Sequence, residues 1–396
     1  MTDNGEYKAD SYGDLKETTE KNKRNSEMTL DVEDYMDDSH LASKQASKQA
    51  SKQASKQASK QARIISLDVC KGVCMLMVIL GHQFEKTRIG VPLQFIQTFH
   101  MPMFFMIAGY FISERLMVNE YSIKRSKRLL IPYVITCLVA DLLCSIVVML
   151  KEHEISIAMN EFIKRLWITI YGSGSGHGSI VTRSEIGMMW YLLGLLWSSI
   201  VVKAICKNKF AGIIALLISS IAIGSTTIFG WIPLSFQSGL GAVMWVWIGY
   251  YVRKNELLDE IKRFVASPWI LLIFVAWILS AVYGVTHLYG NYYRLGVVDA
   301  VGAVAGSLLI FGLCEAVSEK ESWFRKCLAW IGVNSLLIYC LHFLENNVMP
   351  VDRVLKVVGL SDLTLIALLS WLIIVVLCCL LVMVLKRIQI VKVIFG

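Results

Sequence analysis

Long apolar segments alternate with short polar ones from residue 66 to the end of this 396-residue chain. A helix needs about twenty mainly apolar residues to cross the hydrocarbon core of a bilayer, so we expect ten membrane-spanning helices. The predicted spans are 66–84, 93–113, 129–150, 187–203, 210–229, 238–252, 268–285, 296–317, 328–348 and 363–385. The predicted fold class is all-α, a polytopic bundle of about ten transmembrane helices.

A polar segment precedes the first predicted span. It divides the chain into a tail, residues 1–62, and a membrane domain, residues 63–396. In the tail, Ala-Ser-Lys-Gln repeats five times from Ala42 to Gln61. The tail has too few apolar residues to bury a core, so we expect it to be disordered. Its lysines could rest on anionic lipid headgroups, or the repeat could be a solvated spacer.

Composition agrees with a membrane protein. Mean hydropathy is +0.55, and 55% of residues are hydrophobic while only 18% are charged, which excludes a soluble enzyme. The ten cysteines lie in or beside apolar runs without metal-ligand spacing, so we interpret them as small buried residues. The expected partner is the lipid bilayer, and no feature predicts nucleic-acid binding.

Basic residues predict the orientation. They cluster after the second, fourth, sixth, eighth and tenth predicted spans, and the alternate loops are poorer in them. Cytoplasmic loops of membrane proteins are enriched in Lys and Arg, so both termini should be cytoplasmic. We expect a multi-pass protein of the cell membrane, and specifically of a bacterial cytoplasmic membrane.

Three ionisable side chains lie in the first predicted span. Asp68 and Lys71 are three residues apart and His82 follows Lys71 by eleven, so all three share one helical face. Lys71 and His82 are then about 16 Å apart along the axis, with Lys71 at the cytoplasmic end. Charge inside a membrane is costly and often marks a functional site. Alternatively, Asp68 and Lys71 mark a helix start at the interface and His82 caps the outer end.

Further motifs follow in the other predicted spans. They are Phe99-His100-Met101-Pro102 with Ala108-Gly109-Tyr110, Arg128-Leu129-Leu130-Ile131-Pro132-Tyr133, Trp190-Tyr191-Leu192, Trp247-Ile248-Gly249-Tyr250-Tyr251, and Ile331-Gly332-Val333-Asn334-Ser335 running on to His342. In this order and spacing the set resembles the acyltransferase 3 family of integral-membrane acyltransferases, most closely its fucose 4-O-acetylase-like branch. The resemblance covers residues 63–396.

The resemblance implies an enzyme that takes an acyl group, usually acetyl, from cytoplasmic acyl-CoA. It implies delivery of that group to a hydroxyl of a cell-envelope carbohydrate or a related acceptor. Family members carry a basic residue and a histidine in the first helix with ten residues between them, which Lys71 and His82 match. One position departs from the family, because Ala108 stands where a serine is common.

These residues suggest roles. Attack of a hydroxyl on a thioester needs a base, and His82 is our candidate. His100, at a similar depth, either shares its proton path or is an interfacial residue. Lys71 would hold the anionic end of acetyl-CoA, or the arm leading from it, and Asp68 would orient Lys71 or pair with it in the empty state. The cluster formed by Arg125, Lys127 and Arg128 either contacts the CoA phosphates or only sets the topology.

On the outer side, Trp190 and Tyr191 are candidates to stack on a sugar ring, or they anchor the helix in the aromatic belt. They follow a long loop, residues 151–185, which contains a short interfacial helix at about 157–170. Its glycine- and serine-rich run is either a mobile lid or a passive linker. No residue spacing in the chain predicts a metal site.

Two acids and one histidine pair complete the candidates. Asp141 and Asp299 lie within predicted spans, and Asp299 could pair with Arg294. His342 and Glu345 are three residues apart and should form a hydrogen bond that pins helices together.

A transporter, flippase or export component without acyl-transfer chemistry is the rival interpretation, because it would also combine many spans with isolated polar residues. Transporters often contain inverted repeats with broken helices, and we find no such internal symmetry in the sequence. Loss of activity on replacing His82 would distinguish an enzyme from a carrier.

Overall fold

The structure, a computed structural model, describes residues 65–175 and 184–395. The predicted tail, residues 1–62, lies outside this part of the chain, and so does part of the glycine- and serine-rich run of the long loop. The boundary between tail and membrane domain therefore stays a prediction.

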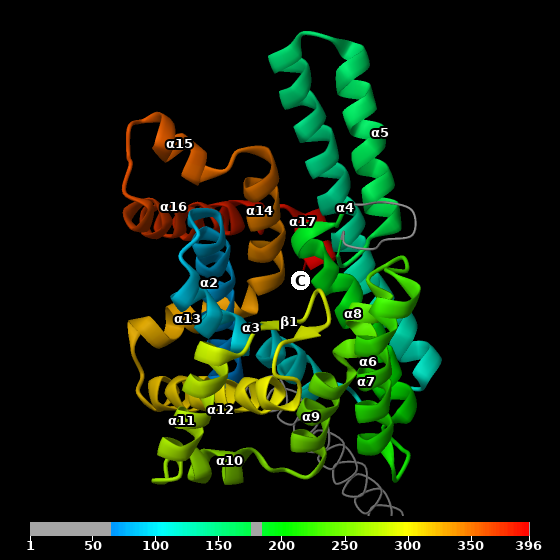
Figure 1. The fold of residues 1–396 in the computed structure, drawn as a ribbon, viewed down its shortest axis with the longest axis vertical. Helices are drawn as coiled ribbons and strands as arrows, with labels where there is room; N and C mark the ends of the chain where they lie inside the picture. The colour runs from blue at the N-terminus through cyan, green and yellow to red at the C-terminus, as the bar shows by residue number, and fades with distance from the viewer. Residues whose placement is uncertain (1–64, 176–183, 396) are drawn as a thin grey trace, which may run out of the picture. The chain divides into compact units, whose positions relative to one another are not determined.

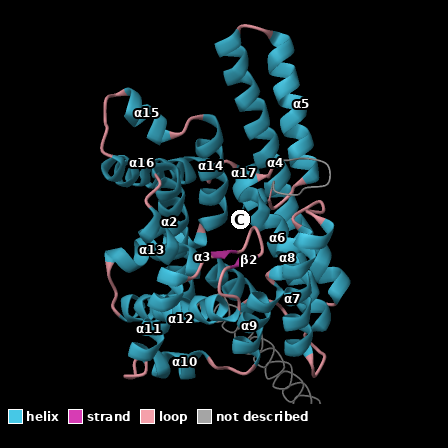
Figure 2. Ribbon diagram, viewed as in Figure 1, coloured by secondary structure: helices cyan, strands magenta, loops and turns pink. Residues whose placement is uncertain are grey.

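Helices form most of the described chain (Figures 1 and 2). In chain order they are α2 (Ile65–Thr87), α3 (Gly90–Tyr110), α4 (Val118–Glu152), α5 (Ile155–Tyr171), the short 3₁₀ turn η1 (Gly187–Met189), α6 (Trp190–Ile205), α7 (Ala211–Phe229), α8 (Phe236–Gly241), α9 (Val243–Lys254), α10 (Leu258–Val265), α11 (Ile270–Tyr283), α12 (Val297–Glu319), α13 (Trp323–Val333), α14 (Ser335–Val348), α15 (Val351–Val357), α16 (Leu363–Leu385) and α17 (Gln389–Phe395). Strands β1 (Thr286–His287) and β2 (Tyr292–Tyr293) form an antiparallel hairpin that the sequence did not predict.

The helical prediction is confirmed, since each predicted span overlaps helical residues. Six described helices are long and apolar enough to cross a membrane, and up to eight spans result if each of two bent helix pairs is one span. The chain is thus a multi-pass all-α membrane protein. The count of ten spans and the cytoplasmic termini stay predictions.

Two helix pairs bend sharply. The axes of α10 and α11 meet at 88°, and those of α13 and α14 meet at 73°. The second bend falls at Asn334, within the predicted span 328–348, which is therefore not one straight helix. Asn334 lies between the two helices, and its side-chain amide donates to the carbonyl of Trp330. A side chain that competes for backbone hydrogen bonds in this way weakens the helix at that point.

Glycines allow two pairs of helices to touch at their backbones. A Cβ on Gly72 of α2 would collide with the carbonyl of Leu328 in α13, and a Cβ on Gly332 would collide with the carbonyl of Asp68. Small residues at helix crossings in membranes permit such close approach. The glycines therefore fix the position of α13 against the Asp68 end of α2.

The same arrangement joins α3 and α9. A Cβ on Gly109 would meet the carbonyl of Val246, and a Cβ on Gly249 would meet the carbonyl of Met106. Both glycines belong to the motifs singled out in the sequence, where their role as contact points was not recognised.

Polar contacts hold the segment that follows α3. Lys203 is buried and donates from Nζ to the carbonyl of Ser113 at 2.7 Å. Arg253 donates to the carbonyl of Tyr110 at 3.2 Å, and the Tyr250 hydroxyl donates to Glu114 at 2.9 Å. Cations near carbonyl groups at a helix C-terminus are favourable, so these residues fix the connection from α3 to α4.

The intramembrane acids have structural partners. Asp141 accepts a hydrogen bond at 2.9 Å from Thr169, which joins α4 to α5, and the two helices lie side by side (Figure 1). Asp299 accepts from the backbone N–H of Leu295 at 2.7 Å and so joins the first turn of α12 to the residues that precede it. The helix expected at about 157–170 is present as α5.

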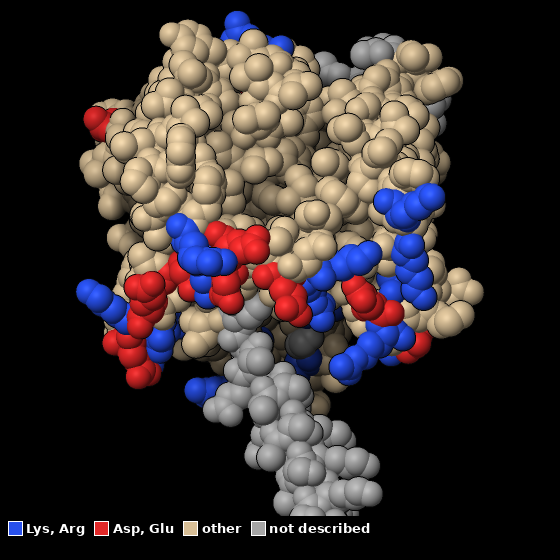
Figure 3. All heavy atoms as spheres, turned by 90° about the horizontal axis from the view of Figure 1, so that it is seen from below, with Lys and Arg blue, Asp and Glu red and all other residues tan. Residues whose placement is uncertain are grey.

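Charge is unevenly distributed on the surface. On the face shown in Figure 3, basic and acidic side chains gather in one band beside a broad area that has few of them. Many large apolar side chains of α4, α11 and α16 are exposed. Such surfaces are expected where helices face hydrocarbon and the charged band faces water.

Candidate functional site

A small cavity brings several predicted residues together. It has a volume of about 150 Å³ and is lined by residues of α2, α3, α6, α14 and the hairpin. His82, His100 and Trp190 all contribute to its wall. We call it the histidine pocket.

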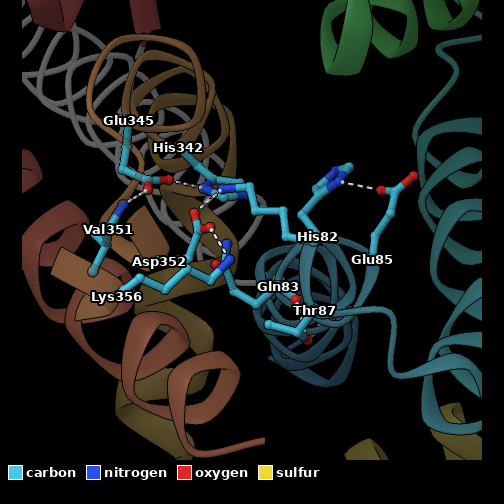
Figure 4. Close-up of polar contacts among 10 residues, drawn as sticks. His82, Gln83, Glu85, Thr87, His342, Glu345, Val351, Asp352 and Lys356 are labelled. Carbon is cyan, nitrogen blue, oxygen red and sulfur yellow. Dashed lines mark hydrogen bonds and ion pairs between the residues drawn. The ribbon is translucent and has the colours of Figure 1, made fainter. Parts of the chain in front are cut away.

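His82 interacts with the carboxylate one helical turn further along α2. Its Nδ1 lies 3.3 Å from Oε2 of Glu85 (Figure 4). A carboxylate only accepts hydrogen bonds, so Nδ1 is the donor and the neutral ring keeps its lone pair on Nε2. The His82 side chain is 31% exposed, which leaves this ring open to the pocket. The geometry therefore presents a basic nitrogen within the cavity.

A second histidine lies behind His82. The ring of His342 in α14 is fully buried, and its centroid is 5.7 Å from that of His82. Its Nδ1 lies 3.1 Å from Glu345, whose other oxygen accepts from the backbone N–H of Val351 at 3.0 Å. The predicted contact between His342 and Glu345 is thus confirmed (Figure 4). It also fixes the imidazole that packs against His82.

His100 has a fixed tautomer for the same reason as His82. Its Nδ1 donates to the carbonyl of Ile96 at 2.6 Å. A neutral ring in this state has an acceptor nitrogen at Nε2. Because His100 lines the pocket, it supplies a second nitrogen that can hold a proton.

Among the polar residues of the pocket that sequence reasoning missed are Glu85, Glu185 and His287. Glu85 could have been found, because it lies one helical turn from His82. Glu185 and His287 lie in connections far apart in the sequence, and only the folded hairpin brings His287 to α2. Burial lowers the pKa of His287, and the charge of Glu85 opposes that shift.

The hairpin also supplies Tyr289, whose ring packs against that of Trp190 at 6.5 Å between centroids. Burial raises the pKa of Tyr289, and the negative charges of Glu85 and Glu185 raise it further. Tyr289 is therefore a neutral hydroxyl group at the edge of the pocket.

The two aromatic residues predicted to bind substrate separate in the structure. Trp190 lines the histidine pocket, whereas Tyr191 packs deeper among other rings. Its ring lies 5.2 Å from Phe105 and 5.8 Å from Tyr339. Tyr339, which does line the pocket, donates a hydrogen bond to the carbonyl of Met188. Tyr191 thus belongs to an aromatic layer next to the pocket.

Asp68 and Lys71 form the predicted pair. Lys71 Nζ lies 2.5 Å from Asp68 Oδ1 and 5.7 Å from the centre of the Phe111 ring. Neither residue lines the histidine pocket. The structure therefore places Asp68 beside Lys71, three turns away from His82.

The basic cluster of α4 contains one inward residue. Nε and Nη2 of Arg125 are buried and have no hydrogen-bond partner among the described residues, whereas Lys127 and Arg128 are exposed. Arg125 lies within electrostatic range of Tyr191 in the aromatic layer. A buried cation without a partner is unfavourable, so this guanidinium is suited to an anionic ligand.

Possible metal ligands are scattered. Within residues 65–175 and 184–395, no group of three or more His, Cys, Asp or Glu side chains is arranged to hold a metal ion.

Comparison with known proteins gives one match. The family model described as "Acyltransferase domain" matches residues 64–387, which is most of the chain and includes every candidate residue above. No curated protein and no solved structure matches the chain.

Proposed function

The chain belongs to the acyltransferase 3 family, and from this we propose that it moves an acetyl or related acyl group from cytoplasmic acyl-CoA to a hydroxyl of a cell-envelope carbohydrate. It is a multi-pass membrane acyltransferase by family and composition. Donor, acceptor and residue roles are our proposal. The convergence of His82, His100 and Trp190 on one pocket is the observation that carries it.

His82 acts as the general base in this proposal. Its Nε2 takes the proton of the acceptor hydroxyl while the hydroxyl oxygen attacks the thioester carbon. The new C–O bond forms, the C–S bond breaks, and the CoA thiolate leaves and takes up a proton. Glu85 holds the required tautomer and stabilises the imidazolium, and His342 packs behind the ring. His100 is the second imidazole on the proton path.

The donor binds along α2 toward Lys71. A pocket of about 150 Å³ is smaller than the 300–1,000 Å³ typical of ligand sites, so only the reacting ends fit there. Lys71, oriented by Asp68, holds the anionic part of CoA, and Arg125 supplies the unpaired guanidinium for a phosphate. Lys127 and Arg128 contribute charge at the entrance. The flexible arm of CoA has a length of the same order as the Lys71–His82 separation.

On the acceptor side, Trp190 offers a ring face for a sugar, and Tyr191 supports it from the aromatic layer. Membership of the fucose 4-O-acetylase-like branch is part of this proposal. A transporter or flippase without acyl-transfer chemistry is not favoured, because the family consists of acyltransferases.

The direct test measures acetyl-CoA turnover by the purified protein in lipid with a panel of sugars. Loss of a general base costs about 10² to 10⁴ in rate, so His82→Asn should lower kcat by at least a hundredfold. His153→Asn is the matched control, because His153 is exposed at the end of α4 in a left-handed conformation (φ 54°) that asparagine tolerates.

Folding must be compared in parallel. Thermal unfolding of both variants should match that of the wild type, so that a lost rate reports chemistry. Full activity of His82→Asn would disprove the assignment of the base. A wild type that binds acetyl-CoA but acylates none of the sugars would contradict the proposed carbohydrate acceptor.

A further inference from the structure

A second cavity, which we call the apolar groove, lies between α7, α9, α11 and α12. It has a volume of about 770 Å³, within the range of sites that bury most of a small ligand. Leu216, Met244, Ala276, Ala300 and Val304 are among its lining residues. The groove is about five times larger than the histidine pocket and has a different chemical character.

Two polar side chains at the edge of the groove, Ser219 and Tyr293, already have hydrogen-bond partners. Ser219 Oγ donates to the carbonyl of Leu240 at 3.2 Å and accepts from the N–H of Met244 at 3.0 Å. The Tyr293 hydroxyl accepts from Trp245 Nε1 at 3.1 Å, and burial raises the pKa of Tyr293 to about 12. A ligand would gain little by bringing its own polar groups here, so a hydrocarbon chain fits best.

One side of the groove is open. Leu272 and Val297 line it and are 65% and 79% exposed. In a membrane protein, exposed apolar residues of this kind face lipid chains. A hydrocarbon chain can therefore enter the groove sideways from the bilayer.

The hairpin of β1 and β2 lies between the groove and the histidine pocket. Thr286, His287 and Tyr289 line the pocket, whereas Tyr293 lines the groove. In Figure 1 the hairpin, drawn in yellow, lies between α3 and α8. One short element thus forms part of the wall of both cavities.

Helix α8 fixes this hairpin. Ser238 Oγ donates to the carbonyl of Tyr289 at 2.7 Å, and Asn291 Nδ2 donates to the carbonyl of Gln237 at 2.8 Å. A Cβ on Gly241 would collide with the side chain of Asn291, so α8 and the hairpin are in close contact. The spacing between the two cavities is therefore set by packed structure.

We propose that the apolar groove binds the hydrocarbon chain of a lipid-linked acceptor, whose hydroxyl-bearing headgroup lies across the hairpin in the histidine pocket. This inference rests on the proposed function and narrows its acceptor to amphiphiles. A lipid that occupied only the groove would make no use of the hairpin as a wall common to both cavities.

The kinetic test compares two acceptors, methyl glucoside and dodecyl glucoside. Each buried methylene strengthens binding about fourfold, so KM should be much lower for the dodecyl compound in the wild type. Ala300→Phe and Ala276→Phe fill the groove and should each raise KM for dodecyl glucoside at least tenfold. The kcat and the KM for methyl glucoside should not change.

Ala316→Phe is the matched control, because Ala316 is exposed on the same helix as Ala300 and outside the groove. The Ala316→Phe variant leaves the partitioning of dodecyl glucoside into the membrane unaltered. An equal KM for both acceptors in the wild type would overturn the inference, and so would equal effects of Ala300→Phe and Ala316→Phe. Absence of transfer to both acceptors in the wild type would instead contradict the proposed function.

A measurement that needs no turnover separates these cases. A dodecyl glucoside with a photoreactive diazirine at the chain end is crosslinked to the protein, and labelled peptides are identified by mass spectrometry. Labels should concentrate on α11 and α12 and should decrease in Ala300→Phe. Labels spread evenly over exposed helices such as α16 would overturn the groove as a binding site.

Discussion

The two ends of α2 each carry a pair of polar side chains three residues apart. They differ in the elements that pack around the pair. Asp68 and Lys71 pair over three residues at 2.5 Å, and His82 and Glu85 pair over three residues at 3.3 Å. Around the first pair, α13 approaches to backbone contact and the charges are neutralised. Around the second pair, the neighbouring elements leave a cavity, the histidine pocket. Helical spacing alone is thus enough to form such a pair of side chains, but the packing of neighbouring elements decides which pair can contact a ligand.

The largest expected effect concerns the close crossing at the Asp68 end. Gly332→Ala places a methyl group against the carbonyl of Asp68, and overpacking of this kind costs about 1–3 kcal/mol of stability. Thermal unfolding in detergent should show the loss. KM for acetyl-CoA should rise in the folded fraction, while KM for the sugar stays constant.

Gly224→Ala is the matched control for that crossing, because a Cβ there meets no atom within 4 Å and alanine favours a helix. Its unfolding temperature should be equal to or above that of the wild type. If both glycine variants unfold alike, the crossing does not hold the Lys71 end together.

A smaller effect is expected from the buried guanidinium. Arg125→Gln removes a charged hydrogen-bond donor, so KM for acetyl-CoA should rise about tenfold, which is about 1.4 kcal/mol, with little change in kcat. Lys124→Gln controls for net charge, since Lys124 is exposed and paired with Glu120 at 2.6 Å. Equal kinetics of the two variants would remove Arg125 from the donor site.

The smallest effect concerns pH at the His82 end. Burial lowers the pKa of His287 in the folded protein. The unfolded chain therefore binds a proton first as pH falls below about 6.5, and stability declines from there toward the lower folded pKa. His287→Gln cannot titrate, so its unfolding temperature should fall less between pH 7.5 and pH 5 than that of the wild type. Identical decreases would show that His287 titrates as in the unfolded chain.

The sequence predicted those parts of the site that depend on one helix. Helical spacing predicts two side-chain pairs, Asp68 with Lys71 and His342 with Glu345, and the structure contains both. Helical spacing also predicts that Lys71 and His82 share one face of α2. His287 reaches the pocket only through the tertiary position of the hairpin, for which no local pattern exists. Arg125 and Lys127 belong to the same basic cluster, but the Arg125 side chain points inward and the Lys127 side chain is exposed. This difference also depends on packing.

The fold shows the same division. Long apolar segments located the helices, because a helix that crosses a bilayer needs about twenty mainly apolar residues. The bend at Asn334 escaped prediction because its position in the sequence does not say whether an asparagine side chain will bond to the backbone of its own helix. The crossing at Gly109 and Gly249 escaped prediction because it depends on which other helix lies opposite.

The glycine crossings also separate what can be varied from what cannot. Gly72, Gly109, Gly249 and Gly332 set the distances between helices without lining the histidine pocket or the apolar groove. If the groove binds the acceptor as proposed, its specificity can therefore be redesigned by changing lining residues such as Ala300 while these four positions are held constant. The helix crossings thus form the constant framework and the cavity linings are the variable part. A directed-evolution library should vary the lining residues and keep the four glycines.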